Sequence, residues 1–236
     1  MEISLSYRDS VSLLKILSGR RDITPTINLK NNLLTYFDEA NEKIFDFRPP
    51  LPFPQIQSVS DPAYYSDLQN TLPPPYLIIL IQAGNSALAY TKEGKIEKHK
   101  VIKKYMVRKK QGKSQISFLK TKGKSRAGSR VRLANTVLFF EEINEKLLEW
   151  TKGNDIGRIL YSWPVSMTAL IFNSKIKPPF EKKDSRLIKI PMDVNIPNFA
   201  EIQRVNRFVI TGILRQYKEN YLVKDLLGEI EKVSQI

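Results

Sequence analysis

The chain has 236 residues, no cysteine and a single histidine, and these shortages exclude several kinds of active site. Without cysteine there is no disulfide, no disulfide-linked partner, no catalytic thiol and no cysteine-ligated zinc. His99 lies among lysines in an expected strand, and we interpret it as a solvated strand residue. Catalytic triads and histidine metal sites therefore lack their parts, and we expect no metal and no other cofactor.

Long apolar runs are also scarce. The longest, Tyr76–Ile81, is far shorter than the roughly 20 residues that a membrane-spanning helix needs. The N-terminus has an early acid, Glu2, and lacks the apolar core of a signal peptide. We therefore expect no membrane partner. Because a chain without cysteine suits a reducing compartment, we also expect cytoplasmic localisation.

Acidic residues are nearly absent from one segment, residues 95–132, which we call the basic segment. It holds 15 Lys and Arg against one acid, Glu97, and its net charge of +14 equals that of the whole chain. Such a concentration is typical of a polyanion-binding site, in which cations displace counterions from phosphates. The simpler alternative is a solvated basic loop or a localisation signal.

The uncharged centre of the basic segment argues against the simpler alternative. A run of charge has no need of the two glutamines and the serine that surround Gly112 in residues 111–115. Glycine and serine let a backbone approach phosphates closely. The segment lacks carboxylates for a two-metal nuclease centre, and its two GKS triplets lack the glycine spacing of a Walker loop. Its amides, hydroxyls and cations can position water and stabilise anions.

The hydrophobic pattern before residue 76 predicts a small N-terminal α+β region over residues 1–45, with a short strand followed by helices over 11–17 and 29–43. Residues 46–75 contain 8 of the 14 prolines. They predict a proline-rich linker or an irregular wrap, parts of which dock through aromatic side chains.

From Tyr76 onward the pattern predicts an α/β domain over residues 76–218, followed by a helical tail over 219–236. A continuous apolar run and its partner predict a hairpin, and a third strand leads into a basic loop over 108–129. The further expected elements are a helix from Ser129 to Trp150, strands at 158–163 and 187–190, and a helix after Asn198 with the core stripe Ile202, Val205, Val209 and Ile213.

Three separated motifs resemble the Vms-one-like release factor (VLRF) family. RKKQGKSQ at Arg108–Gln115 and AGSRVR at Ala127–Arg132 are similar to the family's RKKQGGSQ and its helix-opening AGSxxR. The third match, in DSRLIKIPMDVNIPNFAEIQR, comprises Asp184, Arg186, Pro191, Pro197, Glu201 and Arg204. The resemblance covers residues 76–215. It implies an RNase H-like α/β domain with a mixed sheet, akin to the middle domain of eukaryotic class 1 release factors.

The resemblance also implies a function. Family members are ribosome-associated rescue factors that free nascent chains from peptidyl-tRNA on stalled large subunits. They act as a peptidyl-tRNA hydrolase or cut the tRNA near its CCA end, so the implied partners are the large ribosomal subunit and peptidyl-tRNA. Gln115 corresponds to the family's critical glutamine, and Gly112 and Ser114 carry over with it as catalytic positions. The residues expected to bind RNA are Arg108, Lys109, Lys110, Lys113, Lys122, Lys124, Arg126, Arg130 and Arg132.

Some alternatives stay open at this point. Lys113 stands where the family usually has a second glycine, and this departure motivates a non-catalytic RNA-binding or ribosome-binding module as the alternative function. In the third motif, the simpler interpretation is structural. Asp184 and Arg186 would pair with each other, and Glu201 would cap the helix that follows Asn198.

Overall fold

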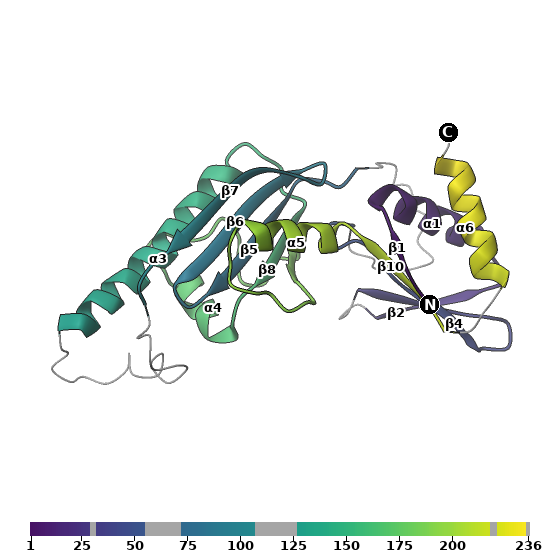
Figure 1. Ribbon diagram of the computed structural model, residues 1–236, viewed down its shortest axis with the longest axis horizontal. Helices are drawn as coiled ribbons and strands as arrows, with labels where there is room; N and C mark the ends of the chain where they lie inside the picture. The colour runs from purple at the N-terminus through teal and green to yellow at the C-terminus, as the bar shows by residue number, and fades with distance from the viewer. Residues whose placement is uncertain (29–31, 55–71, 107–126, 218–220, 235–236) are drawn as a thin grey trace. The chain divides into compact units, whose positions relative to one another are not determined.

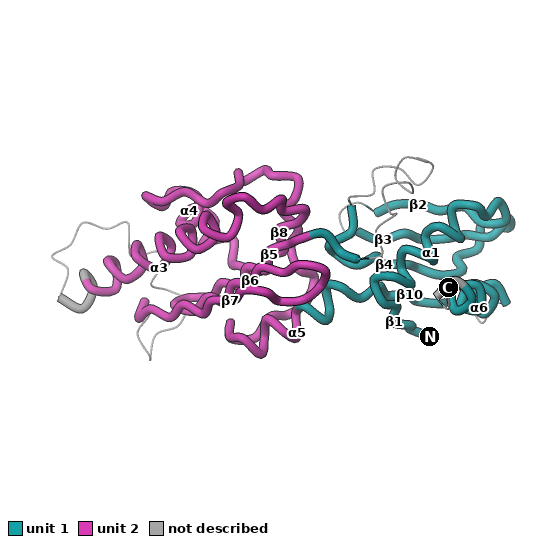
Figure 2. The backbone as a smooth tube through the Cα atoms, turned by 90° about the horizontal axis from the view of Figure 1, so that it is seen from above, with its two compact units in different colours: residues 1–74, 206–236 teal, residues 75–205 magenta. Residues whose placement is uncertain are grey.

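The computed structural model describes residues 1–28, 32–54, 72–106, 127–217 and 221–234 (Figure 1). Within these residues it is a mixed α/β structure with two five-stranded sheets and five helices. The chain divides into two compact units, the first formed by residues 1–74 and 206–236 and the second by residues 75–205 (Figure 2).

The first unit is an antiparallel sheet with the strand order β1-β10-β4-β3-β2. Its strands are β1 (Glu2–Leu5), β2 (Thr24–Asn28), β3 (Leu33–Phe37), β4 (Lys43–Arg48) and β10 (Gly212–Gln216). Two helices, α1 (Tyr7–Gly19) and α6 (Tyr221–Ser234), contribute to the same hydrophobic core as the strands. Burial alternates along β3, whereas residues 44–47 of β4 are buried on both faces of the sheet.

Two expectations for this unit need correction. The helix predicted over 29–43 is wrong, because residues 33–37 form β3 and Lys43 begins β4. The apolar spacing of Leu33–Phe37 fits either structure, and pairing with β2 and β4 decides for the strand. In the predicted linker or wrap, residues 46–48 belong to β4, and Phe53 is buried and stacks on Tyr7 at 4.6 Å. Residues 55–71 of that segment lie outside the described residues.

The second unit contains a mixed sheet with the strand order β7-β6-β5-β8-β9. Its strands are β5 (Tyr76–Gln82), β6 (Asn85–Lys92), β7 (Lys95–Lys103), β8 (Arg158–Ser162) and β9 (Leu187–Lys189). The predicted hairpin and the third strand after it are confirmed, since β5, β6 and β7 pair antiparallel in succession. The pairs β5–β8 and β8–β9 are parallel.

Helices cover both faces of this sheet, as expected for a strand as apolar as β5. In Figures 1 and 2, α3 (Ala127–Thr151) and α4 (Val165–Phe172) lie on one face and α5 (Phe199–Val209) on the other. The first face includes Ile79, which packs in the same core as the residues of α3 and α4. On the other face, the ring of Phe199 at the start of α5 lies 4.1 Å from that of His99 on β7.

The predicted extension of the last long helix to Ile213 is wrong. Helix α5 ends at Val209, and Ile213 lies in β10, where it pairs with Arg48 of β4. At Gly212, strand β10 lies very close to helix α1, because a Cβ at this position would be only 2.2 Å from Ser10 Oγ. This close contact belongs to the strand that replaces the predicted end of the helix. Residues 206–217 consequently pack with the first unit, whereas the sequence placed them in the 76–218 domain.

Candidate nucleic-acid interface

The basic segment runs along β7, whose carboxyl end lies at one edge of the second sheet, and ends in the first turns of α3. Strands β5, β7, β8 and β9 all run in the same direction, so their carboxyl ends share this edge. In open α/β sheets, ligands bind in crevices at the carboxyl ends of the strands. The carboxyl edge is therefore the place to look for a site.

Most residues predicted to act at this site lie outside the described residues. These are Arg108, Lys109, Lys110, Gly112, Lys113, Ser114, Gln115, Lys122, Lys124 and Arg126. Arg130 and Arg132 lie in the first two turns of α3, near its N-terminus, and the side chain of Arg132 is half-buried. The catalytic and RNA-binding roles of all these residues stay predictions. The described residues define the frame from which the loop extends.

One part of the frame is a backbone contact between the residue that follows β7 and the β5–β6 turn. The backbone N–H of Lys104, just after β7, donates a hydrogen bond of 2.9 Å to the carbonyl of Gly84 in the β5–β6 turn. Gly84 has φ +77°, and a Cβ there would lie 2.5 Å from the Lys104 carbonyl oxygen. Only glycine allows this approach, so the turn supports the point where the basic segment leaves the sheet.

The other part is helix α3, which holds the same stretch of chain. Asn135 donates from Nδ2 to the carbonyl of Tyr105 at 3.0 Å, and Glu142 accepts from Lys104 Nζ at 2.9 Å. Helix α3 begins at Ala127, eight residues before Asn135 and therefore about 12 Å away along the helix axis. Helix α3 therefore holds the stretch after β7 at the carboxyl edge, and the first turns of α3, where the basic segment ends, lie further along the same helix axis.

An open hollow of about 280 Å³ lies at this base. It is lined by Ala83, Gly84, Asn85, Lys103, Lys104, Tyr105 and Met106. The side chain of Lys103 is exposed and has no acidic partner among the residues that the structure describes. Tyr105 is 54% exposed. A free ammonium beside an exposed ring is a combination that suits a nucleotide, whose phosphate needs a cation and whose base stacks on aromatic rings.

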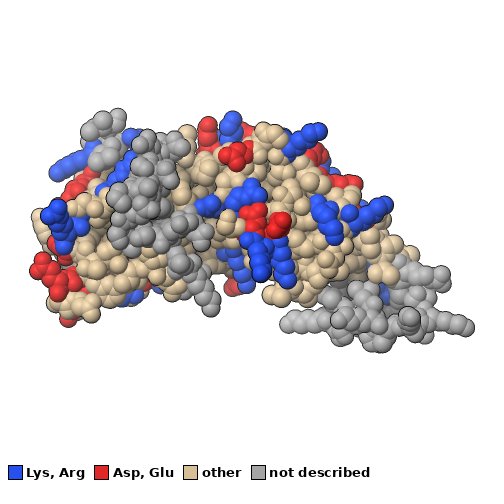
Figure 3. All heavy atoms as spheres, turned by 180° about the vertical axis from the view of Figure 1, so that it is seen from behind, with Lys and Arg blue, Asp and Glu red and all other residues tan. Residues whose placement is uncertain are grey.

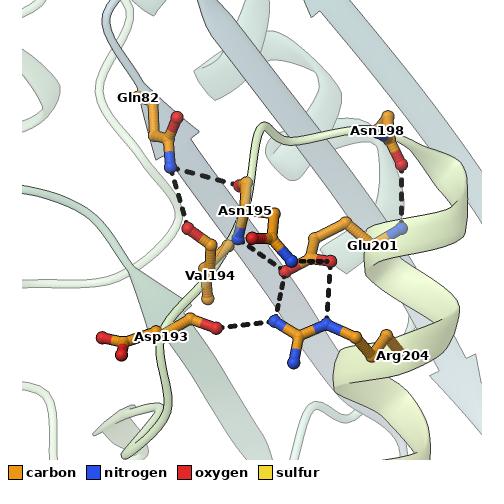
Figure 4. Close-up of polar contacts among 7 residues, drawn as sticks. All are labelled: Gln82, Asp193, Val194, Asn195, Asn198, Glu201 and Arg204. Carbon is orange, nitrogen blue, oxygen red and sulfur yellow. Dashed lines mark hydrogen bonds and ion pairs between the residues drawn. The ribbon is translucent and has the colours of Figure 1, made fainter.

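A hydrogen-bonded clamp, formed by Gln82, Asn195, Glu201 and Arg204, holds the adjoining part of this edge (Figure 4). Glu201 is 5% exposed, and its carboxylate accepts from Asn195 N at 2.7 Å and from Arg204 Nη2 at 2.6 Å. Gln82, at the end of β5, donates to the carbonyls of Val194 and Asn195 at 3.0 and 3.1 Å. The clamp ties residues 193–195 to α5 and to the carboxyl end of β5.

Electrostatics give Glu201 a structural role. Hydrogen bonds from Arg204, and then from Asn195, lower the pKa of Glu201 although its burial acts in the opposite direction. The carboxylate is therefore held ionised and saturated, which does not suit a general acid. Asn198 Oδ1 accepts from Glu201 N at 2.8 Å, so Asn198 caps α5, but the Glu201 side chain does not supply the expected cap. The return contact of Glu201 goes to Asn195 instead.

The other half of the third motif is structural as well. Arg186 donates to Asp184 from Nε at 3.0 Å and from Nη2 at 2.7 Å, which confirms the expected pairing. Arg186 Nη1 also donates to the carbonyl of Ile156 at 3.1 Å, ahead of β8. This pair fixes the chain that leads into β9, far from the loop's base at the other end of the strands.

The sequence missed the supports of the frame. Asn135 and Glu142 lie in an ordinary helical stripe, and their partners are about 30 or more residues away in the chain. Gln82 offered a weak signal, because it is the one polar residue that ends an otherwise apolar strand. In the described ranges, no three His, Asp or Glu side chains gather into a metal-binding cluster. No described helix has the length and apolarity to cross a membrane.

Comparisons with known proteins show the family and the fold of this chain. Residues 76–217, more than half of the chain, match the family model described as Bacteroidetes VLRF1 release factor. The chain is 28% identical over 158 residues to the mouse (Mus musculus) tRNA endonuclease ANKZF1 and 30% identical over the same length to the human (Homo sapiens) one. Each alignment covers 65% of this chain and 21% of the relative. The chain therefore spans about a fifth of the length of these relatives.

A solved structure, the Vms1 mitochondrial localization core, has a similar fold with a TM-score of 0.51 at 13% identity. The superposition covers 91% of this chain and 98% of that one, so the likeness includes both units. The family match makes this chain a VLRF-type protein, and its mixed α/β fold is similar to that of the Vms1 core. More narrowly, the chain belongs to the Bacteroidetes VLRF1 release factor family. The finer RNase H-like assignment stays a prediction.

Proposed function

We propose that this protein is a ribosome-associated rescue factor that frees nascent chains from peptidyl-tRNA on stalled large ribosomal subunits, in the cytoplasm. The observation that carries the proposal is the family match over residues 76–217, which spans the basic segment and the whole carboxyl-edge frame. The relatives' name, tRNA endonuclease, supports a cut in the tRNA, and the VLRF resemblance implies that this cut lies near the CCA end. Hydrolysis of the peptidyl ester is the other form of release.

The frame supports this function in a specific way. The basic segment carries the entire net charge of the chain and extends from a base held by Gly84, Asn135 and Glu142. A fixed base lets a loop reach a buried RNA site while its root stays in place. The cations would hold phosphates, and Gln115, with Ser114 and Gly112 beside it, would align the attacking hydroxyl or water.

Gln115 can position but cannot abstract a proton, because an amide has donors and an acceptor but no usable pKa near neutrality. We therefore expect Gln115→Ala to bind large subunits normally and to lose about 100-fold or more in release rate. Gln115→Glu should also fail, because its anion would be repelled by the phosphates of the substrate. Lys113→Gly, which restores the family's usual glycine, should keep or raise activity.

The test incubates the full chain with stalled large subunits and scores both the released peptide and the sequence at the tRNA 3′ end. A matched control is Gln111→Ala, which removes the other glutamine of the same loop. If Gln115→Ala released peptide at the unmutated rate, the catalytic role that the family resemblance assigns to Gln115 would be wrong.

The second candidate function is the non-catalytic RNA-binding or ribosome-binding module, and Lys113 is the observation that favours it. In that case the protein would bind large subunits with steep salt dependence, while neither the peptide nor the tRNA end would change. The same assay therefore separates the two candidates without a further reagent.

A further inference from the structure

Basic residues also gather outside the basic segment. In Figure 3, Lys and Arg side chains stand in separate groups on the described surface, some beside acidic side chains and others apart from them. In the sequence, six of the residues 173–189, between α4 and the end of β9, are Lys or Arg and two are acidic. The lysines are Lys175, Lys177, Lys182, Lys183 and Lys189, and all are exposed.

The local acids do not neutralise these lysines. Asp184 is occupied by the two side-chain hydrogen bonds from Arg186, which lower its pKa. Lys177 Nζ donates to the carbonyl of Phe172 at the C-terminus of α4. Within the described part of the chain, Lys175, Lys182 and Lys183 form no ion pair. Only Glu181 is left to offset them, so the surface carries a net positive charge.

Two of these lysines, Lys177 and Lys182, line an open and largely apolar hollow. It has a volume of about 440 Å³ and is lined by Phe172, Lys177, Pro178, Pro179, Phe180, Glu181 and Lys182. Phe180 is 6% exposed and meets Phe172 edge to face, with ring centroids 6.0 Å apart. The floor is therefore built from rings that are packed in place.

A buried side chain of α3 fixes Ile171 and Ile176, the chain neighbours of the lining residues Phe172 and Lys177. Asn144 is fully buried, and its Nδ2 donates to the carbonyl of Ile171 at 2.9 Å and to that of Ile176 at 2.7 Å. These two bonds hold the last turn of α4 and the start of the lysine-rich loop in a single arrangement. A hollow fixed in this way needs no rearrangement to receive a ligand, which reduces the cost of binding.

We propose that this surface, Lys175–Lys183 with Phe172, is a second binding site for single-stranded RNA. A polyanion suits the free lysines, and among polyanions RNA also has flat bases that can lie on the phenylalanine and proline floor. Asn144 lies nine residues beyond Asn135, so the hollow is about 14 Å along α3 from the base of the loop. The two sites therefore contact different nucleotides. The proposal deepens the proposed function, and it rests on that function for RNA as the partner.

The test measures fluorescence anisotropy of a labelled single-stranded oligouridine RNA bound to the full chain. Both triples are made in a background variant in which the contribution of the basic segment is removed. In this variant Gln replaces Lys109, Lys110, Lys122 and Lys124. In this background we compare Lys175→Gln/Lys182→Gln/Lys183→Gln with the matched control Lys15→Gln/Lys224→Gln/Lys232→Gln. The control removes three exposed lysines of the first unit, so both triples lose the same charge.

We expect the first triple to weaken binding at least tenfold and to flatten the slope of log affinity against log salt by about 2. The control should change affinity less than twofold. Photocrosslinking with 4-thiouridine in the RNA should label Phe172 or Phe180. Equal losses in the two triples would overturn the proposal. Competition by polyglutamate as strong as by RNA, without a crosslink, would overturn it in favour of an acidic peptide.

The proposed function can fail independently of this result. If the protein releases no peptide but the first triple alone loses RNA binding, the second site stands and the rescue function falls. If release is normal and the two triples behave alike, the rescue function stands and the second site falls.

Discussion

Two strands of this protein, β5 of the second sheet and β3 of the first, use their faces differently. In the second sheet, six of the seven residues of β5 are buried, and neighbours such as Ile78 and Ile79, which point to opposite faces, are both at most 1% exposed. In β3 of the first sheet, Leu34 is 1% exposed, whereas its neighbour Thr35, on the opposite face, is half-exposed. A continuous apolar run thus marks a strand covered on both sides, and an alternating one marks a strand covered on one side.

The largest expected effect tests this difference directly. Ile78→Ala and Ile79→Ala should each lower the free energy of unfolding by about 2–5 kcal/mol, because each leaves a cavity in a packed layer. Leu34→Ala in the first sheet should cost a similar amount. Urea denaturation, followed by a probe in each unit, measures these losses. A cost below 1 kcal/mol for Ile78→Ala would mean that the α5 side of the second sheet is not a packed face.

The next expected effect concerns the frame at the carboxyl edge. Gly84 and Gly153 have nearly the same backbone conformation, with φ of +77° and +75°, but only Gly84 faces a close neighbour. Gly153→Ala should cost about 1 kcal/mol, the ordinary penalty for a side chain in the left-handed region. Gly84→Ala should cost about 1–3 kcal/mol more, since its Cβ would meet the Lys104 carbonyl. Equal costs for the two variants, measured by denaturation, would show that the close approach at Gly84 is not maintained.

The same contrast explains which elements the sequence predicted. The buried run of β5 and the turn at Gly84 identified the second sheet, because few other structures bury so many consecutive residues. In the first sheet, the spacing of Leu33, Leu34, Tyr36 and Phe37 fits a helix and a strand equally well. Only the pairing with β2 and β4, which is a long-range property, decides between them. The strand β10 depends in the same way on partners about 165 and 210 residues away.

For the site, the sequence predicted the charge of the basic segment and the VLRF motifs. The side chains that hold the root of the loop became visible only in the fold. The net charge of the basic segment can be counted from the sequence, and the VLRF match depends only on the order of residues along the chain. The contacts of Asn135 and Glu142 with the root of the loop depend on where α3 lies on the sheet, which no local pattern encodes. The second lysine cluster was hidden because the whole remainder of the chain is electrically balanced, and an average over 198 residues conceals a local excess.

A smaller effect is expected at the clamp. Glu201→Gln keeps the shape of the side chain but removes its charge, so the hydrogen bonds from Arg204 weaken by about 1–3 kcal/mol. The pKa of Glu201 is lowered by folding, so its stabilisation is complete above the unfolded value of 4.5 and is lost as pH falls through the folded pKa. The difference in stability between Glu201→Gln and the unmutated protein should therefore shrink below about pH 4.5.

Denaturation from pH 7 to pH 3 measures this trend, with Glu231→Gln on the exposed surface of α6 as the control. The control should change stability by less than about 0.5 kcal/mol at any pH. A stability difference for Glu201→Gln that does not vary with pH would contradict an ionised clamp.

The smallest expected effect is at Thr35 of β3, on the face opposite to Leu34. Its hydroxyl donates to Asp46 at 2.7 Å, beside further donors from Lys43 and Tyr217. Burial raises the pKa of Asp46, but the hydrogen bonds from Tyr217, Thr35 and Lys43 outweigh burial and lower it. Thr35→Val removes one of these donors and should cost about 1 kcal/mol at pH 7. The carboxylate's contribution is present above its unfolded pKa of 3.8 and is lost as pH falls through its lower folded value, so the cost should shrink below pH 3.8. A cost as large as that of Leu34→Ala, in the same denaturation experiment, would mean that both faces of β3 are packed and would remove the contrast with β5.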